Sequence, residues 1–95
     1  MTNIILCAIL KAKSGQKEKL RNELLKLVEP SRAEKGCIEY KLHQSLEEDR
    51  TFLFYEIWAS EREINEHVNT EHYKEYEKNK EAIIDSMDVY RLENL

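Results

Sequence analysis

The sequence has little of what marks a disordered or repetitive chain. It holds one proline and two glycines in 95 residues, whereas 41% of its residues are apolar and 36% are charged. Disordered chains are poor in apolar residues and often rich in proline or glycine, so this composition predicts an ordered domain. The length fits a single domain, residues 1–95, which buries only a modest share of its unfolded surface. A second subunit would add burial.

Cysteine is scarce as well. Cys7 and Cys37 both stand in apolar, strand-like segments, and two cysteines do not make a disulfide framework. We expect two buried or half-buried thiols, because free cysteine usually behaves as a small hydrophobic residue. A reactive Cys37 is the alternative.

Positive charge and long apolar runs are missing too. The net charge is -4 and the pI is about 5.4, so the clustered Lys and Arg that nucleic-acid binding requires are absent. The longest apolar run, residues 4–10, is far short of the ~20 residues that cross a bilayer. It also lacks the basic leader and cleavage site of a secretory signal. We therefore expect a cytoplasmic protein that binds neither nucleic acid nor membrane.

Cofactor-binding motifs are also absent. The sequence contains no GxGxxG, P-loop, GxSxG or CxxC pattern, so dinucleotide, nucleotide, hydrolase and thiol-redox functions lose their usual support. If the protein is an enzyme, we expect it to work without a cofactor.

The first half of the chain predicts a strand followed by a helix. Residues 3–12 are an aliphatic and β-branched run too short for an ordinary helix. Ser14 can cap an amphipathic helix that runs to about Glu34, with a kink or break at Pro30. Gly36 suits the left-handed position after the helix.

Two strands and a second helical region follow. Residues 37–46 alternate between an apolar side with Ile38 and Tyr40 and a polar side with His43, and residues 51–59 are rich in aromatic and β-branched types. A polar turn joins them as a hairpin.

The last part of the chain predicts helix and then strand. Ser60 and Glu63 fit a capping box, Thr70 is a second possible N-cap, and the segment after Asp85 is typical of a strand. The order βαββαβ predicts an α+β, ferredoxin-like fold with a four-stranded antiparallel sheet and helices on one face.

Both faces of this sheet are largely apolar. In residues 51–59 one face carries Leu53, Tyr55 and Ile57, and the other carries Phe52, Phe54, Glu56 and Trp58. A sheet with one face in water should alternate apolar and polar residues. Because the chain has too few helices to cover both faces, we expect a homodimer joined through its sheets.

The segment EHVNTEH, residues 66–72, contains two of the three histidines. On one continuous helix, His67 and His72 would diverge, because a shared ligand site needs a spacing of three or four. A break at Thr70 could bring them together, but no third ligand with zinc-like spacing is evident, and His43 does not supply one. We therefore predict no metal site.

His67 and His72 are also the catalytic candidates. His67 shares a helical face with Ile64 and Val68, so it is either a hydrogen-bonded core histidine or a functional one. His72 follows the possible cap Thr70 near a helix N-terminus, where the helix dipole favours a neutral imidazole that can act as a base. It is the preferred base.

Three further residues are candidates for a substrate pocket. Glu56 interrupts an apolar strand face, so its carboxylate must be paired, hydrated or shifted in pKa. Trp58 and Tyr40 are either core aromatics or the walls of a pocket for an aromatic ligand.

Several of these residues together carry a family resemblance. Glu34-Lys35-Gly36-Cys37 followed by Tyr40, then residues 54–58, then Glu66-His67 and residues 70–73 resemble the antibiotic biosynthesis monooxygenase domain over nearly the whole chain. The resemblance implies a dimeric α+β barrel. Members of this family include cofactor-free oxygenases of quinols and phenols, heme-degrading enzymes, and an isomerase of autoinducer-2 phosphate.

The resemblance implies a cofactor-independent monooxygenase that acts on a small quinol or phenol. His72 and His67 are the expected catalytic residues, and the expected substrate-binding residues are Tyr40, Glu56, Trp58 and His43. Heme degradation is set aside. By resemblance to the heme-degrading members, the iron-binding histidine would fall near Glu77 and the pocket tryptophan near His67, and neither position holds the required residue type.

Two other functions stay open. One is isomerisation of a small phosphorylated sugar-like ligand, with Arg91 or Lys74 for the phosphate. The other is a non-catalytic dimer that binds a small molecule.

Overall fold

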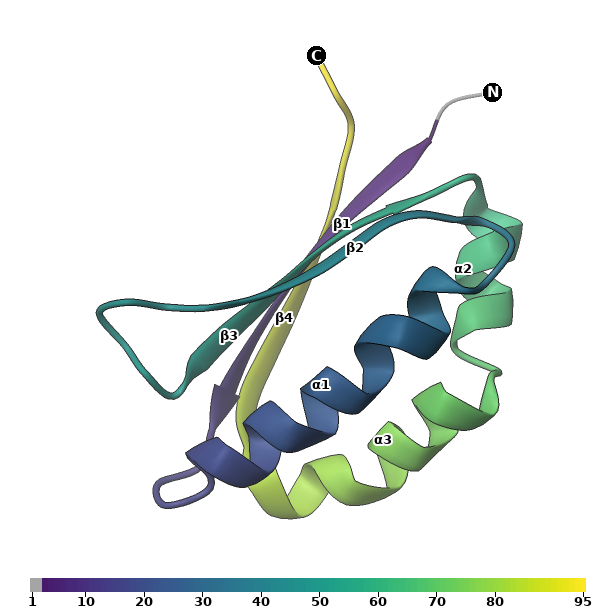
Figure 1. Cartoon of the computed structure of the whole chain (residues 1–95). Helices are drawn as coiled ribbons and strands as arrows, with labels where there is room; N and C mark the ends of the chain where they lie inside the picture. Colours follow the sequence, from purple (N-terminus) through teal and green to yellow (C-terminus); the bar gives the residue numbers. More distant parts are fainter. Residues whose placement is uncertain (1–2) are drawn as a thin grey trace.

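The protein forms one antiparallel sheet with helices on one face (Figure 1). The computed structural model describes residues 3–95. Its elements are β1 (Ile4–Ala12), α1 (Lys17–Arg32), β2 (Cys37–Gln44), β3 (Thr51–Trp58), α2 (Glu61–His67), α3 (Glu71–Ile83) and β4 (Ile84–Leu92). The strand order is β2-β3-β1-β4, and every neighbouring pair is antiparallel. The predicted α+β, ferredoxin-like fold is confirmed.

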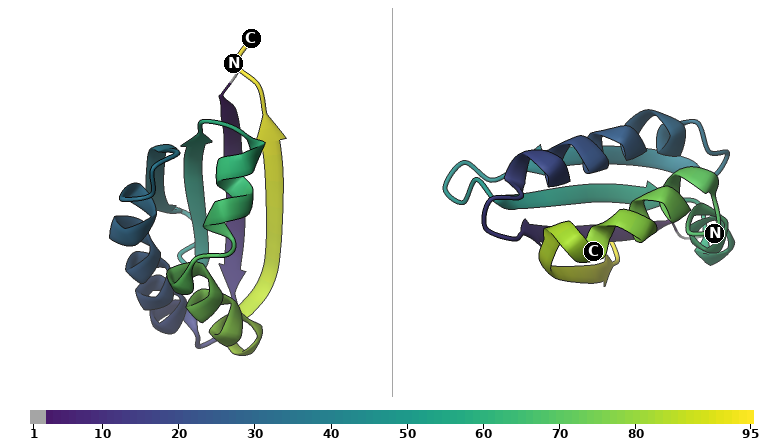
Figure 2. Two further views of the ribbon diagram at one scale, coloured as in Figure 1. Left: turned by 90° about the vertical axis from the view of Figure 1, so that its right-hand side faces the viewer. Right: turned by 90° about the horizontal axis from the view of Figure 1, so that it is seen from below.

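The helices form a single layer. Figure 2 shows α1 and α3 side by side over the same face of the sheet, and the Asn79 amide of α3 donates a hydrogen bond to Glu23 of α1 at 2.9 Å. Among residues 3–95, no helix is long and apolar enough to cross a membrane.

The core lies between this helical layer and the sheet. Leu20, Leu24 and Leu27 are buried on α1, at the spacings of four and three that place them on one face of a helix. They meet the alternate residues of β1, which are buried from Leu6 to Ala12. The sequence periodicities therefore predict this core correctly.

The strands also have an uncovered apolar face. On β3, the residues from Phe52 to Trp58 that alternate toward the helices are buried, whereas the residues between them stay partly exposed. The uncovered face combines side chains of β1 and β3 that lie opposite one another in the register: Ile5, Cys7, Ile9, Leu53, Tyr55 and Ile57. We call this set the outer face. The prediction that one layer of helices leaves one apolar face bare holds for this chain.

Helix α1 differs from its prediction at both ends. Its N-cap is Gln16 rather than Ser14, and it continues through Pro30 to Arg32, so of the two alternatives predicted at Pro30, a kink or a break, the break does not occur. Proline removes one backbone hydrogen bond, but the last turn is held by other contacts. Ser31 is fully buried, and Nε of Arg32 donates to the carbonyl oxygen of Tyr40 at 2.9 Å.

A bulge changes the start of β2. Cys37 pairs with Trp58 and Glu39 with Ile57, so the register shifts between Cys37 and Glu39. The alternation predicted that Ile38 and Tyr40 share one side of the strand. Instead, the extra residue, Ile38, is 50% exposed, whereas Tyr40 is buried. A bulge places two residues opposite one and so interrupts the period of two.

The helical region after β3 is divided into α2 and α3, and the second helix begins after Thr70, as predicted. Thr70 is the N-cap of α3, and its Oγ1 accepts a hydrogen bond from the backbone N–H of Tyr73 at 3.3 Å. At the start of α2, Ser60 donates to the carboxylate of Glu63 and makes no side-chain bond to a backbone N–H. Ser60 is therefore the N-cap, as predicted, but the hydrogen bonds of the predicted capping box are replaced by one between the two side chains.

Glycine is needed at position 36 because a side chain would not fit there, and not because the backbone is left-handed. Among residues 3–95 a positive φ occurs only at Gly15, so the predicted left-handed conformation of Gly36 is wrong. A Cβ at Gly36 would lie 1.8 Å from Cγ and 2.4 Å from Cβ of Glu63. The close approach joins the start of β2 to α2.

We expect Gly36→Ala to lower the free energy of unfolding by ~1–3 kcal/mol, the usual cost of an overpacked contact. Urea unfolding followed by circular dichroism measures it. Adding Glu63→Ala should restore part of the loss, because it removes the nearest clashing atom. Equal stability of Gly36→Ala and the wild-type protein would contradict this explanation.

Candidate functional site

A cavity of about 160 Å³ lies between the sheet and the helices. Its lining is mainly apolar and comes from both layers. The apolar residues that form its floor and sides are Leu6, Ala8, Leu10, Leu27, Phe54 and Ile64. A small, mostly apolar cavity with a few polar groups is the usual form of a small-molecule site.

The polar groups of the cavity include three of the residues that the sequence singled out. Tyr40 from β2, Glu56 from β3 and His67 from α2 all line it. Tyr73 of α3 joins them; it was not among the candidate residues, although it lies in the family-like segment 70–73. Burial raises the pKa of Tyr73 to about 12, with Glu77 and Glu56 adding to the shift, so its hydroxyl keeps its proton near neutral pH.

Glu56 lies on the helix side of the sheet. It is 6% exposed, and its Oε1 accepts a hydrogen bond of 2.8 Å from the indole N–H of Trp58. Burial raises the pKa of Glu56 to about 7, against the opposing effect of that hydrogen bond. The carboxyl group can therefore change its charge near neutral pH.

Trp58 stands behind the cavity wall. It is fully buried, is not among the residues that line the cavity, and packs against the ring of His67 with a centroid separation of 4.5 Å. It therefore contacts both Glu56 and His67 and fixes their positions.

His67 is the last residue of α2 and is buried. Its Nδ1 lies 2.7 Å from Oε2 of Glu34, and its ring also packs against Tyr73 at 5.0 Å. Because a carboxylate can only accept, Nδ1 carries the proton and Nε2 keeps its lone pair. Burial lowers the pKa of His67, although Glu34 opposes this shift.

His72 lies on the other side of Glu34. Its Nε2 is 2.6 Å from the same Oε2 atom, and its ring centroid is 6.0 Å from that of His67. The break between α2 and α3 brings together two rings that would diverge on one continuous helix. His72 is not among the residues that line the cavity.

Glu34 is the residue that sequence reasoning missed. It lies in the loop between α1 and β2, where no spacing relates it to the histidines, and it appeared only as part of the family-like segment Glu34-Lys35-Gly36-Cys37. The structure makes it the shared partner of His67 and His72. These three side chains could hold a metal ion.

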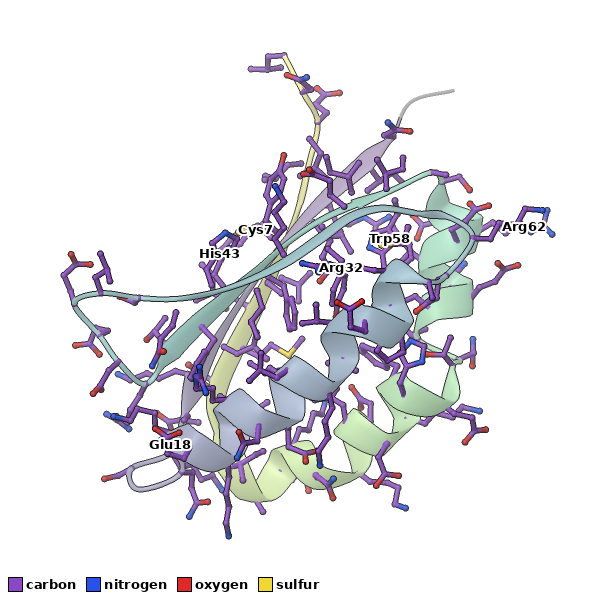
Figure 3. All side chains as sticks on the ribbon, viewed as in Figure 1. Cys7, Glu18, Arg32, His43, Trp58 and Arg62 are labelled. Carbon is purple, nitrogen blue, oxygen red and sulfur yellow. The ribbon has the colours of Figure 1, made fainter. Side chains whose placement is uncertain are left out.

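His43 is not brought to the cavity. It pairs with Leu53 on the outer face, where its Nδ1 lies 3.3 Å from the carbonyl oxygen of Leu53. Figure 3 shows His43 and Cys7 on the side of the sheet opposite to Trp58.

The thiols are not reactive groups of this site. Cys7 and Cys37 are free and half-buried, as expected. Burial raises the pKa of Cys37 to about 11, with Glu34 and Glu56 adding to the shift. The thiol therefore stays protonated near neutral pH, and the alternative of a reactive Cys37 loses support.

The cavity opens toward the edge strand β4. Three apolar residues that line it are substantially exposed: Val68 by 40%, Met87 by 36% and Val89 by 50%. Arg91 also lines it and forms an ion pair with Glu61 at the start of α2. The cavity is therefore open to solvent beside Val68, Met87 and Val89.

Comparison with known proteins agrees with this architecture. Residues 3–79 match the model of the family described as Antibiotic biosynthesis monooxygenase. "Putative monooxygenase YcnE" of Bacillus subtilis is 35% identical over 91 residues, which cover 95% of this chain and 96% of YcnE. The Synechocystis protein sll1783 is 33% identical over 73 residues, 77% of this chain, but this chain spans only 50% of its length.

Solved structures share the fold. PA3566 of Pseudomonas aeruginosa superposes with a TM-score of 0.98 and 36% identity, covering 100% of this chain and 96% of PA3566. Since the family model spans most of the chain and YcnE matches nearly all of it, this protein belongs to the antibiotic biosynthesis monooxygenase family.

Proposed function

We propose that this protein is a cofactor-independent monooxygenase of a single-ring quinol or phenol. The observation that carries the proposal is a mainly apolar cavity against which Glu34 holds the imidazole of His67. Family membership supports the reaction class, and the cavity supports the kind of substrate.

The size of the cavity favours one aromatic ring. Its volume is about 160 Å³, and an engineered apolar cavity of about 150 Å³ in another protein binds benzene. A two-ring quinol would need the cavity to widen toward Met87 and Val89. Because this space is not filled by the protein's own aromatic side chains, a purely structural role is less favoured.

His67 is the proposed general base. Its Nδ1 proton is held by Glu34, so the lone pair of Nε2 is free to accept a proton from a bound phenol. Its lowered pKa favours the neutral, proton-accepting form at pH 7. Glu34 acts as a positioning residue, because a hydrogen-bonded carboxylate fixes the tautomer and orientation of an imidazole.

Once deprotonated, the substrate supplies the electrons for oxygen. The phenolate transfers electrons to O2 and a C–O bond forms at the ring, giving a hydroperoxide. Loss of water from this hydroperoxide leaves a quinone. One oxygen atom enters the product and the other leaves as water, while the ring is oxidised by the electrons that reduce O2. The substrate is thus its own reductant.

Glu56 and Tyr40 are the proposed substrate-binding residues. The indole N–H of Trp58 holds Oε1 of Glu56, which leaves Oε2 able to bond a second hydroxyl group of a quinol. In this proposal Trp58 does not touch the substrate and instead holds Glu56 and His67 in position. We assign His72 a supporting role, because it reaches the cavity only through Glu34.

Isomerisation of a phosphorylated sugar-like ligand is the second candidate, and the charges disfavour it. Among the lining residues of the described chain, Arg91 is the one arginine or lysine, and it is already paired with Glu61. Lys74 is exposed on α3 and does not line the cavity. A phosphate would also lie in the same small cavity as Glu56.

We further propose that the protein is a homodimer joined through the outer faces of its sheets. That face exposes aliphatic and aromatic side chains of β1 and β3, and on β4 it continues with Tyr90 and Leu92, which are about half exposed. Exposed apolar surface of this kind marks an interface.

His67→Ala should lower kcat for a single-ring hydroquinone by at least ~10²-fold, because a positioned base contributes about that much. Oxygen uptake with methylhydroquinone measures this, after subtraction of the rate without protein. Unchanged uptake in folded His67→Ala would remove His67 from this role.

The substrate range tests the size argument separately. The wild-type protein should have a higher kcat/KM for methylhydroquinone than for a two-ring naphthohydroquinone, because the cavity has room for one ring. Catalysed uptake with neither compound would contradict the proposed substrate class.

Glu56→Gln should change how stability depends on pH. Because the folded state raises the pKa of Glu56 from 4.5 to about 7, Glu56 binds its proton more tightly when folded, and the wild-type protein loses stability as the pH rises through this range. The variant lacks this loss. The free energy of unfolding of the variant, relative to that of the wild type, should therefore rise by up to ~3 kcal/mol between pH 5 and pH 8.

Urea unfolding of both proteins at the two pH values measures this difference. The pH-dependent contributions of titratable groups that both proteins share cancel in it. The titratable neighbours are Glu34, His67, Tyr40 and Tyr73, so the comparison uses the difference between the proteins rather than either curve. An equal difference at pH 5 and pH 8 would show that the pKa of Glu56 is not raised.

Tyr55→Asp should convert the dimer to monomers, because it places a charge at the centre of the outer face. Size-exclusion chromatography with light scattering at micromolar concentration measures the mass. Lys19→Glu, on the exposed side of α1, is the matched control and should remain dimeric. A wild-type protein that runs as a stable monomer contradicts the dimer.

A further inference from the structure

Glu34, His67 and His72 form a compact cluster from three separate segments. Glu34 comes from the loop after α1, His67 ends α2, and His72 lies in the first turn of α3. Oε2 of Glu34 is 2.7 Å from Nδ1 of His67 and 2.6 Å from Nε2 of His72. One ligand atom from each residue lies within 4.8 Å of the others.

We infer that this cluster is a binding site for a divalent first-row transition-metal ion of the Zn²⁺ type. Two imidazole nitrogens and one carboxylate oxygen are a donor set that such ions take, with a further position left for water. Mg²⁺ and Ca²⁺ are excluded as the preferred ions, because they favour shells made of oxygen atoms. The site does not depend on the proposed monooxygenase activity.

The ligand atoms must shift to accept the ion. With metal–ligand bonds of about 2.0–2.2 Å, tetrahedral ligand atoms stand about 3.3 Å from one another. The two nitrogen–oxygen distances must therefore lengthen by roughly 0.6 Å, and the two nitrogens, which lie within 4.8 Å of one another, must reach the same separation. The side chains of Glu34 and His72 are 14% and 20% exposed and can turn outward, while Trp58 and Tyr73 hold the ring of His67.

Burial and charge also suit a cation. The side chain of His67 is 5% exposed, so the ion would be partly removed from water. Its attraction to the carboxylate is stronger there than in bulk water. Glu56 is a second acidic group in this part of the molecule, near enough for Glu34 to influence it. The partial exposure of His72 leaves a route for the ion from solvent.

Metal binding would reverse the tautomer of His67. An ion on Nδ1 requires the lone pair there, so the proton moves to Nε2 and the ring becomes a hydrogen-bond donor toward the cavity. The ion and a proton-accepting Nε2 therefore exclude one another. Each state of the site gives the cavity a different polar group.

Cobalt titration tests the site directly. Protein without a histidine tag is stripped with a chelator and titrated with Co²⁺, whose visible absorption reports its coordination geometry. We expect one ion per chain, with competition by Zn²⁺. His72→Ala and Glu34→Gln should each weaken binding by at least ~10-fold, because even second-shell substitutions cost that much.

His43→Ala is the matched control, because it removes the one histidine outside the cluster and should leave the affinity unchanged. Circular dichroism establishes that each variant is folded. If a variant does not fold, X-ray absorption of the Co²⁺-loaded wild-type protein decides instead, with two imidazole ligands expected. An oxygen-only shell, no binding at millimolar Co²⁺, or equal affinity in His72→Ala and the wild-type protein overturns the inference.

Discussion

The bridge from one carboxylate oxygen of Glu34 to two histidines organises this molecule. It joins the loop before β2 to the end of α2 and to the start of α3, so a loop that is more than 30 residues away in sequence meets both helices at one atom. Hydrogen bonds to a charged group are stronger than neutral ones, and they are costly to leave unmade when buried. The orientation of His67, and with it the character of the cavity, depends on this bridge.

The cavity depends equally on what stands behind it. Trp58 packs against His67 and donates to Glu56, so one buried indole positions the imidazole and the carboxyl group from the same side. The pKa of Glu56 rises because burial removes water from its charged form, and the single indole hydrogen bond only partly offsets this. The proposal of a single-ring quinol or phenol as substrate rests on this apolar pocket with one imidazole and one carboxyl group whose pKa lies near neutral pH.

The sheet serves two purposes through its two faces. Because strand side chains alternate, residues such as Glu56 and Trp58 point to the helix side of the sheet while Tyr55 and Ile57 point away from it. The site and the outer face are thus encoded in the same strands without competing for positions. The edge strand β4 contributes to both, since Met87 and Val89 lie at the cavity mouth and Tyr90 lies on the other side.

The sequence by itself determined the architecture. Period-two and helical spacings give the strands, the helices and the two-faced sheet, and the short polar cap Thr70 gives the break between α2 and α3, because these signals are local in the chain. The same signals misplaced Ile38 and Gly36, where a bulge and a close contact with Glu63 intervene.

Only the tertiary structure decided the site. Tyr40, Glu56 and His67 were foreseen as candidates and meet in one cavity, whereas His43 lies on the opposite face and His72 stands behind Glu34. Glu34 could not be chosen from any spacing, because its partners are 33 and 38 residues away. The contact exists only once α1, α2 and α3 have packed, since packing and not sequence distance decides which buried polar groups must pair.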